Sequence, residues 1–109
     1  MPSHQETECL RACNECAAAC LQCATACLKE SDPKSMARCI GLDMECADIC
    51  GLAARSIASG GENMKAVLSL CAQVCETCAS ECTKHPVDHC KRCAEACKRC
   101  AEACHSMAH

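Results

Sequence analysis

The chain has 109 residues, of which 18 are Cys and none is Phe, Trp or Tyr, and its formal net charge is −3. Leu, Ile and Val together number only 13, so the sequence excludes a conventional aliphatic core. A neutral thiol behaves as a small hydrophobic group, so we expect the 18 Cys, 19 Ala and 5 Met to fill the interior. The length fits a single small domain over residues 1–109.

Charge and hydropathy exclude two further classes of protein. Lys and Arg number 11 against 14 Asp and Glu, and no aromatic side chain could stack on bases, so we expect no nucleic-acid binding. No apolar run approaches the roughly 20 residues of a membrane span, and residues 1–8 lack a signal-peptide pattern. We therefore expect a cytoplasmic protein with reduced thiols, in which dense cysteine indicates metal binding rather than disulfides.

Three breaks divide the sequence into four segments of similar length. Ser-Asp-Pro at 31–33 is typical of a helix start, Ser-Gly-Gly at 59–61 of a helix stop, and His-Pro-Val-Asp at 85–88 of a turn. We expect helices over about residues 5–29, 33–58, 62–84 and 88–106. Because the connections are short, neighbouring helices should run antiparallel, which predicts an all-α, up-down-up-down four-helix bundle.

Cysteine carries the periodicity that aliphatic residues usually provide. In the first segment the cysteines from Cys9 to Cys27 alternate in steps of four and three, which is an a/d stripe along one helix face. The other segments repeat this pattern, so the bundle core should be lined with cysteine. Antiparallel packing, counted from the end that holds the 29–33 and 84–88 connections, predicts the layers Cys27/Cys39/Cys82/Cys90, Cys23/Asp43/Cys78/Cys93, Cys20/Cys46/Cys75/Cys97, Cys16/Cys50/Cys71/Cys100, Cys13/Ala54/Leu68/Cys104 and Cys9/Ile57/Met64/Met107.

A tube lined with thiols could hold several kinds of metal or none. Helix axes roughly 8–10 Å apart disfavour disulfides, and no Cys precedes a Pro as in ferredoxin-type motifs, although Cys-x-x-Cys recurs. Four thiolates around Zn²⁺ leave a net charge of about −2, which no Lys or Arg at a core position balances. Cu(I) is soft and accepts low coordination numbers, and one Cu(I) per thiolate is neutral.

The sequence therefore predicts a Cu(I) store in which all 18 cysteines are ligands, with on the order of one ion per cysteine. The Cys-x-x-x-Cys pairs support this, because they place two sulfurs on one helix face one turn apart. A thiol redox or iron–sulfur electron-transfer protein is the alternative from a different class. No Ser-His-Asp set, Gly-rich phosphate loop or catalytic Cys-His pair stands out, so we do not expect an enzyme.

Several segments resemble one known family. Residues 39–50, 71–85 and 88–94, with a closing Cys-His-Ser-Met motif at 104–107, closely resemble the cytosolic bacterial copper storage proteins. The resemblance spans essentially the whole chain. It implies a four-helix bundle, commonly assembled as a tetramer, that holds many Cu(I) ions through cysteine thiolates and acts as a store or buffer rather than an enzyme.

Four other residues are candidate copper contacts at the end that holds the 29–33 and 84–88 connections. Asp43 takes the place of a thiol in the heptad pattern. It either contacts copper or lines the mouth, the open end of the tube beside these connections, or else rotation of its helix turns it to solvent. His85 and His89 are either loop and cap residues or imidazole ligands, and Met36 is either core filler or a soft ligand. Such ligands hold Cu(I) more weakly than thiolates, so we expect copper to arrive here. The opposite end is expected to be plugged by Ile57, Met64, Leu68 and Met107.

Overall fold

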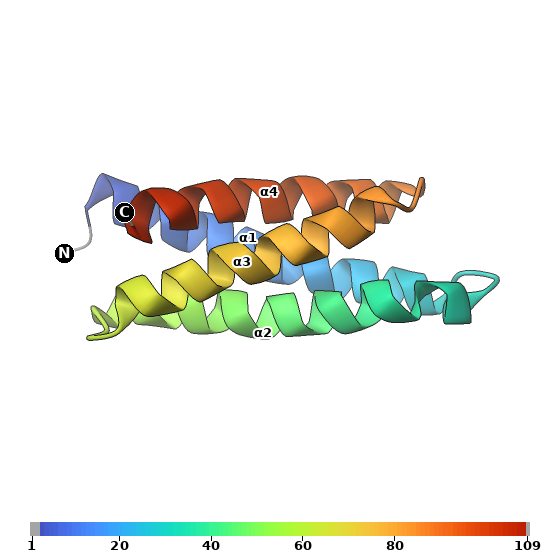
Figure 1. Cartoon of the computed structure of the whole chain (residues 1–109), viewed down its shortest axis with the longest axis horizontal. Helices are drawn as coiled ribbons and strands as arrows, with labels where there is room; N and C mark the ends of the chain where they lie inside the picture. The colour runs from blue at the N-terminus through green and yellow to red at the C-terminus, as the bar shows by residue number, and fades with distance from the viewer. Residues whose placement is uncertain (1–2, 109) are drawn as a thin grey trace.

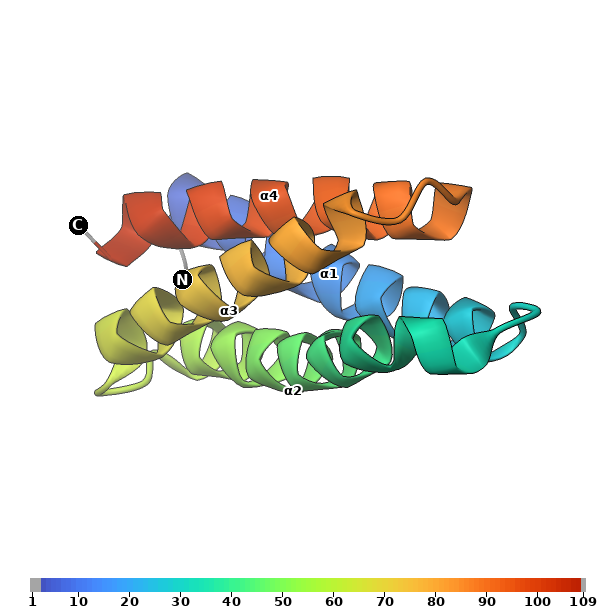
Figure 2. The same ribbon diagram turned by 45° about the vertical axis from the view of Figure 1, so that its right-hand side comes forward.

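The computed structural model describes residues 3–108 and contains a bundle of α-helices. Its elements are α1 (His4–Leu28), the 3-10 turn η1 (Pro33–Met36), α2 (Ala37–Ser59), α3 (Met64–Thr83) and α4 (Asp88–Ala108). The bundle measures 46 × 18 × 17 Å. Figures 1 and 2 show the helices side by side, with the α1–α2 and α3–α4 connections at one end and the α2–α3 connection at the other. The antiparallel four-helix bundle predicted from the sequence is confirmed.

Local signals at the helix ends explain most of the boundaries. The Ser3 hydroxyl accepts a hydrogen bond from the Glu6 backbone N–H, and the Glu6 carboxylate accepts one from the Ser3 N–H, which forms a capping box at the start of α1. Gly60 ends α2 in the left-handed conformation, with a φ of 64°. Glycine adopts that conformation without the steric cost of a Cβ atom. A sharp turn between α2 and α3 follows.

The start of the second helix differs from the prediction. Residues 33–36 form the 3-10 turn η1, and α2 begins only at Ala37. The Asp32 side chain makes no capping hydrogen bond, and the Ser35 hydroxyl donates instead to the Asp32 carbonyl oxygen at 2.8 Å. Met36, the last residue of the turn, is buried with 6% of its surface exposed. The turn thus places Met36 against the core at this end of the bundle.

Two other boundaries move by two residues. Residues 62–63 form a turn and α3 begins at Met64, while α4 continues to Ala108. Neither change alters the helix faces. Among residues 3–108, no helix combines the length and the apolar character that crossing a membrane requires.

The core of the bundle consists mainly of sulfur. All 18 cysteines are free thiols, and each has at most 1% of its surface exposed. Alanines such as Ala53 and Ala72 fill the spaces between the helices, and Leu68 and Ile57 are the large aliphatic residues of the core. Both of these lie toward the end where α2 and α3 are joined. The predicted plug of this end is therefore present, with Met64 and Met107 partly buried against it.

Candidate metal centre

The thiols form one continuous network along the bundle axis. Successive Sγ atoms of the a/d stripes lie 3.9 Å apart in the pairs Cys23–Cys27, Cys46–Cys50 and Cys71–Cys75, as the Cys-x-x-x-Cys spacing predicts. Contacts between helices are equally short. Groups of four Sγ atoms that all lie within 4.8 Å of one another include Cys23/Cys27/Cys39/Cys90, Cys20/Cys78/Cys93/Cys97, Cys16/Cys20/Cys46/Cys97, Cys16/Cys46/Cys50/Cys75 and Cys13/Cys71/Cys100/Cys104.

These groups correct the flat layers expected from the sequence. Cys16 was expected beside Cys71 and Cys100, but its Sγ lies 3.6 Å from that of Cys97 and 3.9 Å from that of Cys46, one layer closer to the His85–His89 end. Cys13, Cys16 and Cys20 of α1 therefore lie between the predicted layers, and each contacts sulfurs of two of them. The consequence is a staggered lining in which neighbouring four-sulfur groups share members instead of forming separate rings.

Burial favours the neutral form of a thiol, because it removes water from the thiolate. Desolvation is the main cause that raises the pKa of Cys27 to about 11 and raises the pKa of Cys90 as well. Within residues 3–108, no Lys, Arg or His lies among the buried residues of the core to stabilise a thiolate. Buried thiols with no cation beside them favour the protonated form, so each thiol that binds a metal ion must first lose its proton.

Asp43 lies inside the thiol network with no exposed surface. This finding removes the alternative in which α2 turns the side chain to solvent. Thiols of α2, α3 and α4 donate to the carboxyl oxygens. The two shortest contacts come from Cys78 at 3.2 Å and Cys93 at 3.3 Å. Burial raises the pKa of Asp43 to about 8. The Asp43 carboxyl group is thus held one layer in from the mouth, with longer contacts to Cys39 and Cys82.

His89 is the histidine that the fold directs at the thiols. Its Nδ1 atom lies 3.6 Å from the Sγ atoms of Cys23 and Cys90 and 3.8 Å from that of Cys27. Its Nε2 atom lies 2.8 Å from a carboxylate oxygen of Glu30, in the α1–α2 connection. Because a carboxylate only accepts hydrogen bonds, Nε2 carries a proton, and in the neutral form of the ring the Nδ1 lone pair then faces the three sulfurs. The Glu30–His89 pair therefore directs a ring nitrogen at the sulfurs of this end of the bundle.

His85 contacts a carboxylate in this structure. Its Nε2 atom donates to Glu81 at 2.9 Å, and Glu81 also accepts from Arg38 at 2.7 Å. The hydrogen bond from His85 is the main cause that lowers the pKa of Glu81. In the described part of the chain the contacts of His85 are thus with a carboxylate rather than with a sulfur. The ammonium group of Lys84 lies 3.6 Å from the same Glu81 carboxylate. This charged cluster joins α2 and α3 at the end that also holds His89.

Sequence patterns could not identify Glu30 and Glu81. Glu30 lies 59 residues from His89 in the chain, so no local spacing connects them. Glu81 offers a weak signal, because it precedes His85 by one helical turn and the pair shares a helix face. Its burial, however, depends on Arg38 of a different helix, which only the fold brings near.

Comparison with known proteins now identifies the family. The profile described as "Csp: Copper storage protein" matches residues 2–109. The chain belongs to the copper storage protein family. The expectation drawn from its sequence segments is confirmed, and the thiol redox or iron–sulfur alternative finds no support in this comparison.

Solved relatives share the whole fold. The Cu(I)-bound copper storage protein BsCsp3 is 47% identical, with a TM-score of 0.93 over 97% of this chain and 100% of that one. A cytosolic copper storage protein from Streptomyces lividans, solved with five coppers, is 38% identical, with a TM-score of 0.90 over 95% of this chain and 92% of that one.

A curated relative gives a shorter match. An uncharacterized cysteine-rich protein, YhjQ of Bacillus subtilis, is 50% identical over 69 residues. That segment covers 63% of this chain and 57% of the relative. The fold-level similarity to copper storage proteins therefore extends well beyond the segment shared with this relative.

Proposed function

We propose that this protein stores Cu(I) in the cytoplasm, holding the ions inside the bundle and catalysing no reaction. The observation that carries the proposal is the continuous network of 18 buried, free thiols. Similarity to a Cu(I)-bound copper storage protein supports the choice of metal, and similarity to a cytosolic one supports the compartment. A homotetramer, implied by the family resemblance, remains a prediction.

All 18 cysteines are the proposed ligands, at on the order of one Cu(I) per thiolate. The Sγ separations of 3.6–4.0 Å between helices leave room for an ion to bridge two sulfurs with small side-chain movements. Overlapping four-sulfur groups favour clusters that share thiolates over isolated tetrahedral sites. Charge supports the same conclusion, because a buried column of ions is tolerated only if each positive charge is matched by one thiolate.

Copper is proposed to arrive at the end that holds Glu30, His89 and Asp43. His89 offers its Nδ1 atom beside three sulfurs, Asp43 lies one layer further in, and Met36 is buried at the same end. His85 acts here by fixing Glu81 rather than by binding the ion. The opposite end carries the plug of Ile57 and Leu68, with Met64 and Met107 packed against it.

The metal content of the protein tests this function. The protein would be produced in cells supplied with copper, iron and zinc, purified without oxygen and analysed for all three metals. The proposal predicts many copper ions per chain and a preparation without visible colour, because Cu(I) has a filled d shell. A brown preparation that contains iron would support the iron–sulfur alternative and contradict the proposal.

A further inference from the structure

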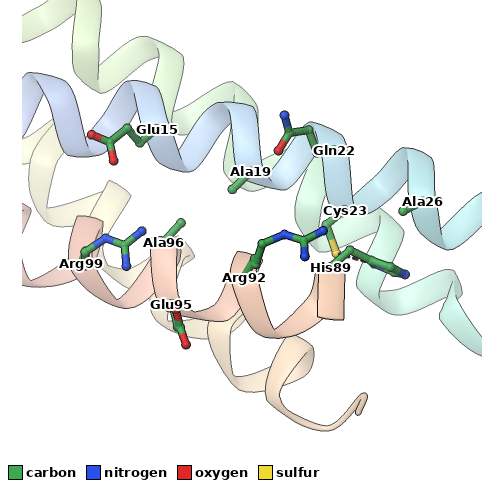
Figure 3. Close-up of a pocket in the computed structure, with 10 residues that line it drawn as sticks. All are labelled: Glu15, Ala19, Gln22, Cys23, Ala26, His89, Arg92, Glu95, Ala96 and Arg99. Atoms are coloured by element: carbon green, nitrogen blue, oxygen red, sulfur yellow. Dashed lines mark hydrogen bonds between the residues drawn. The ribbon is translucent and has the colours of Figure 1, made fainter. Parts of the chain in front are cut away.

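A cleft opens on the side of the bundle between α1 and α4, next to the mouth. It has a volume of about 590 Å³, which is within the usual range for small-ligand sites. Small side chains of both helices, Ala19, Ala26 and Ala96, leave this space between the helix backbones. At one end of the cleft lie Cys23 and His89 (Figure 3). The cleft therefore reaches from the solvent to the His89 ring, which lies against the buried Cys23 sulfur.

Charged side chains line the rest of the cleft. Arg92 and Arg99 lie on α4 one heptad apart, and Figure 3 shows Arg92 extended toward Cys23 and His89. Within the described residues neither guanidinium group forms an ion pair, although Glu15 of α1 lines the cleft near Arg99. Two guanidinium groups without ion-pair partners favour a ligand with carboxylates, and the carboxylates of Glu15 and Glu95 favour one that also bears an ammonium group.

The position of Cys23 indicates what such a ligand would carry. The Cys23 sulfur has no exposed surface, and the His89 ring lies against it, with Nδ1 3.6 Å from Sγ and 15% of the side chain exposed. A molecule held by Arg92 would place its own functional group beside this His89–Cys23 pair. A thiol is the group that exchanges a soft ion with another thiol.

We propose that the α1–α4 cleft binds a small thiol that bears carboxylate and ammonium groups, and that this thiol carries Cu(I) to or from Cys23. The proposal rests on the function proposed above. In the delivery step the Cu–S bond of the carrier breaks as a Cu–Sγ bond forms at Cys23. The proton of the Cys23 thiol passes to the carrier sulfur, which leaves as a free thiol, and copper stays Cu(I) throughout. His89 meets the ion as it passes to Cys23.

The test compares two carriers and two matched double variants. Metal-free, reduced protein would receive Cu(I) anaerobically from complexes with glutathione, which carries two carboxylates and an ammonium group, or with 2-mercaptoethanol, which carries no charge. The variant Arg92→Gln/Arg99→Gln removes the two positive charges of the cleft. Lys91→Gln/Lys98→Gln is the control, because these exposed lysines have the same heptad spacing on α4 but lie outside the cleft. Far-UV circular dichroism checks that both variants remain helical.

We expect the arginine variant to slow transfer from glutathione by about fivefold or more, the effect of losing two partly exposed charge contacts. Transfer from 2-mercaptoethanol should stay within about twofold of wild type, as should both transfers in the lysine variant. Equal slowing with both carriers, no slowing, or equal slowing in the lysine variant would overturn the cleft assignment. Failure of the wild-type protein to take up copper even from a weak chelator would instead overturn the storage function, so the two failures are distinguishable.

Discussion

Asp43 sets a pH dependence that a core of thiols alone would not have. Its pKa, ordinarily 3.8, is raised to about 8 by burial in the folded protein, so the folded state binds its proton more tightly than the unfolded chain does. The stability from this proton is complete below about pH 4 and is lost as the pH rises toward 8. For a single proton the slope is at most about 1.4 kcal/mol per pH unit.

The variant Asp43→Asn isolates this effect. Urea unfolding of the reduced, metal-free protein between pH 5 and pH 8 should show the wild-type free energy of unfolding falling with pH and the variant changing much less. The amide keeps the size of the side chain and accepts hydrogen bonds from Cys78 and Cys93, so packing is nearly unchanged. Parallel pH profiles for the two proteins would show that the buried carboxyl group is not the source.

His89 and His85 provide a matched pair, because both lie at the same end of the bundle but only one faces sulfur among the described contacts. We expect His89→Ala to change the rate at which Cu(I) is loaded and removed, since it deletes the nitrogen beside Cys23, Cys27 and Cys90. Total capacity should stay within about one or two ions, because the number of thiolates is unchanged. Stopped-flow mixing with a Cu(I)–chelator complex measures both quantities. A larger effect of His85→Ala than of His89→Ala would mean that the wrong histidine has been assigned.

At the scale of the helices, the cysteine periodicity predicted which residues face the core. It did not predict how far each helix is shifted along the bundle axis. Every cysteine that the heptad pattern placed inside is buried. The shift that puts Cys16 of α1 beside Cys46 of α2 involves the connection over residues 29–36, which joins these two helices. That connection contains the η1 turn, whose 3-10 geometry follows from tertiary packing of Met36 rather than from any repeat.

The end of α2 makes a second prediction at this scale. Gly60 has a φ of 64°, so Gly60→Ala should destabilise the protein by about 1 kcal/mol. Gly51 lies inside α2 with nothing within 4 Å of an added Cβ atom, so Gly51→Ala should stabilise it by about 0.5–1 kcal/mol. Urea midpoints of the two metal-free variants give both values. The same sign of change at both positions would contradict the assignment of Gly60 as the left-handed cap.

At the scale of the whole molecule, charge neutrality explains how a bundle of 109 residues could hold a column of metal ions. The metal-free core is neutral because its thiols are protonated, and the loaded core is neutral because each Cu(I) replaces one proton. The composition predicted this interior directly, since few aliphatic and no aromatic residues were available to fill it. The mouth was harder to predict, because the Glu30–His89 pair joins segments that only the closed bundle brings together.

The central claim is that the thiols bind copper together at a ratio close to one. An anaerobic titration of fully reduced protein with Cu(I) against a competing chelator, with the released protons measured by a pH indicator, tests it most directly. The account predicts saturation near 18 ions per chain and about one proton released per ion. Saturation at about four or five ions, the capacity of separate tetrahedral four-thiolate sites, would contradict it.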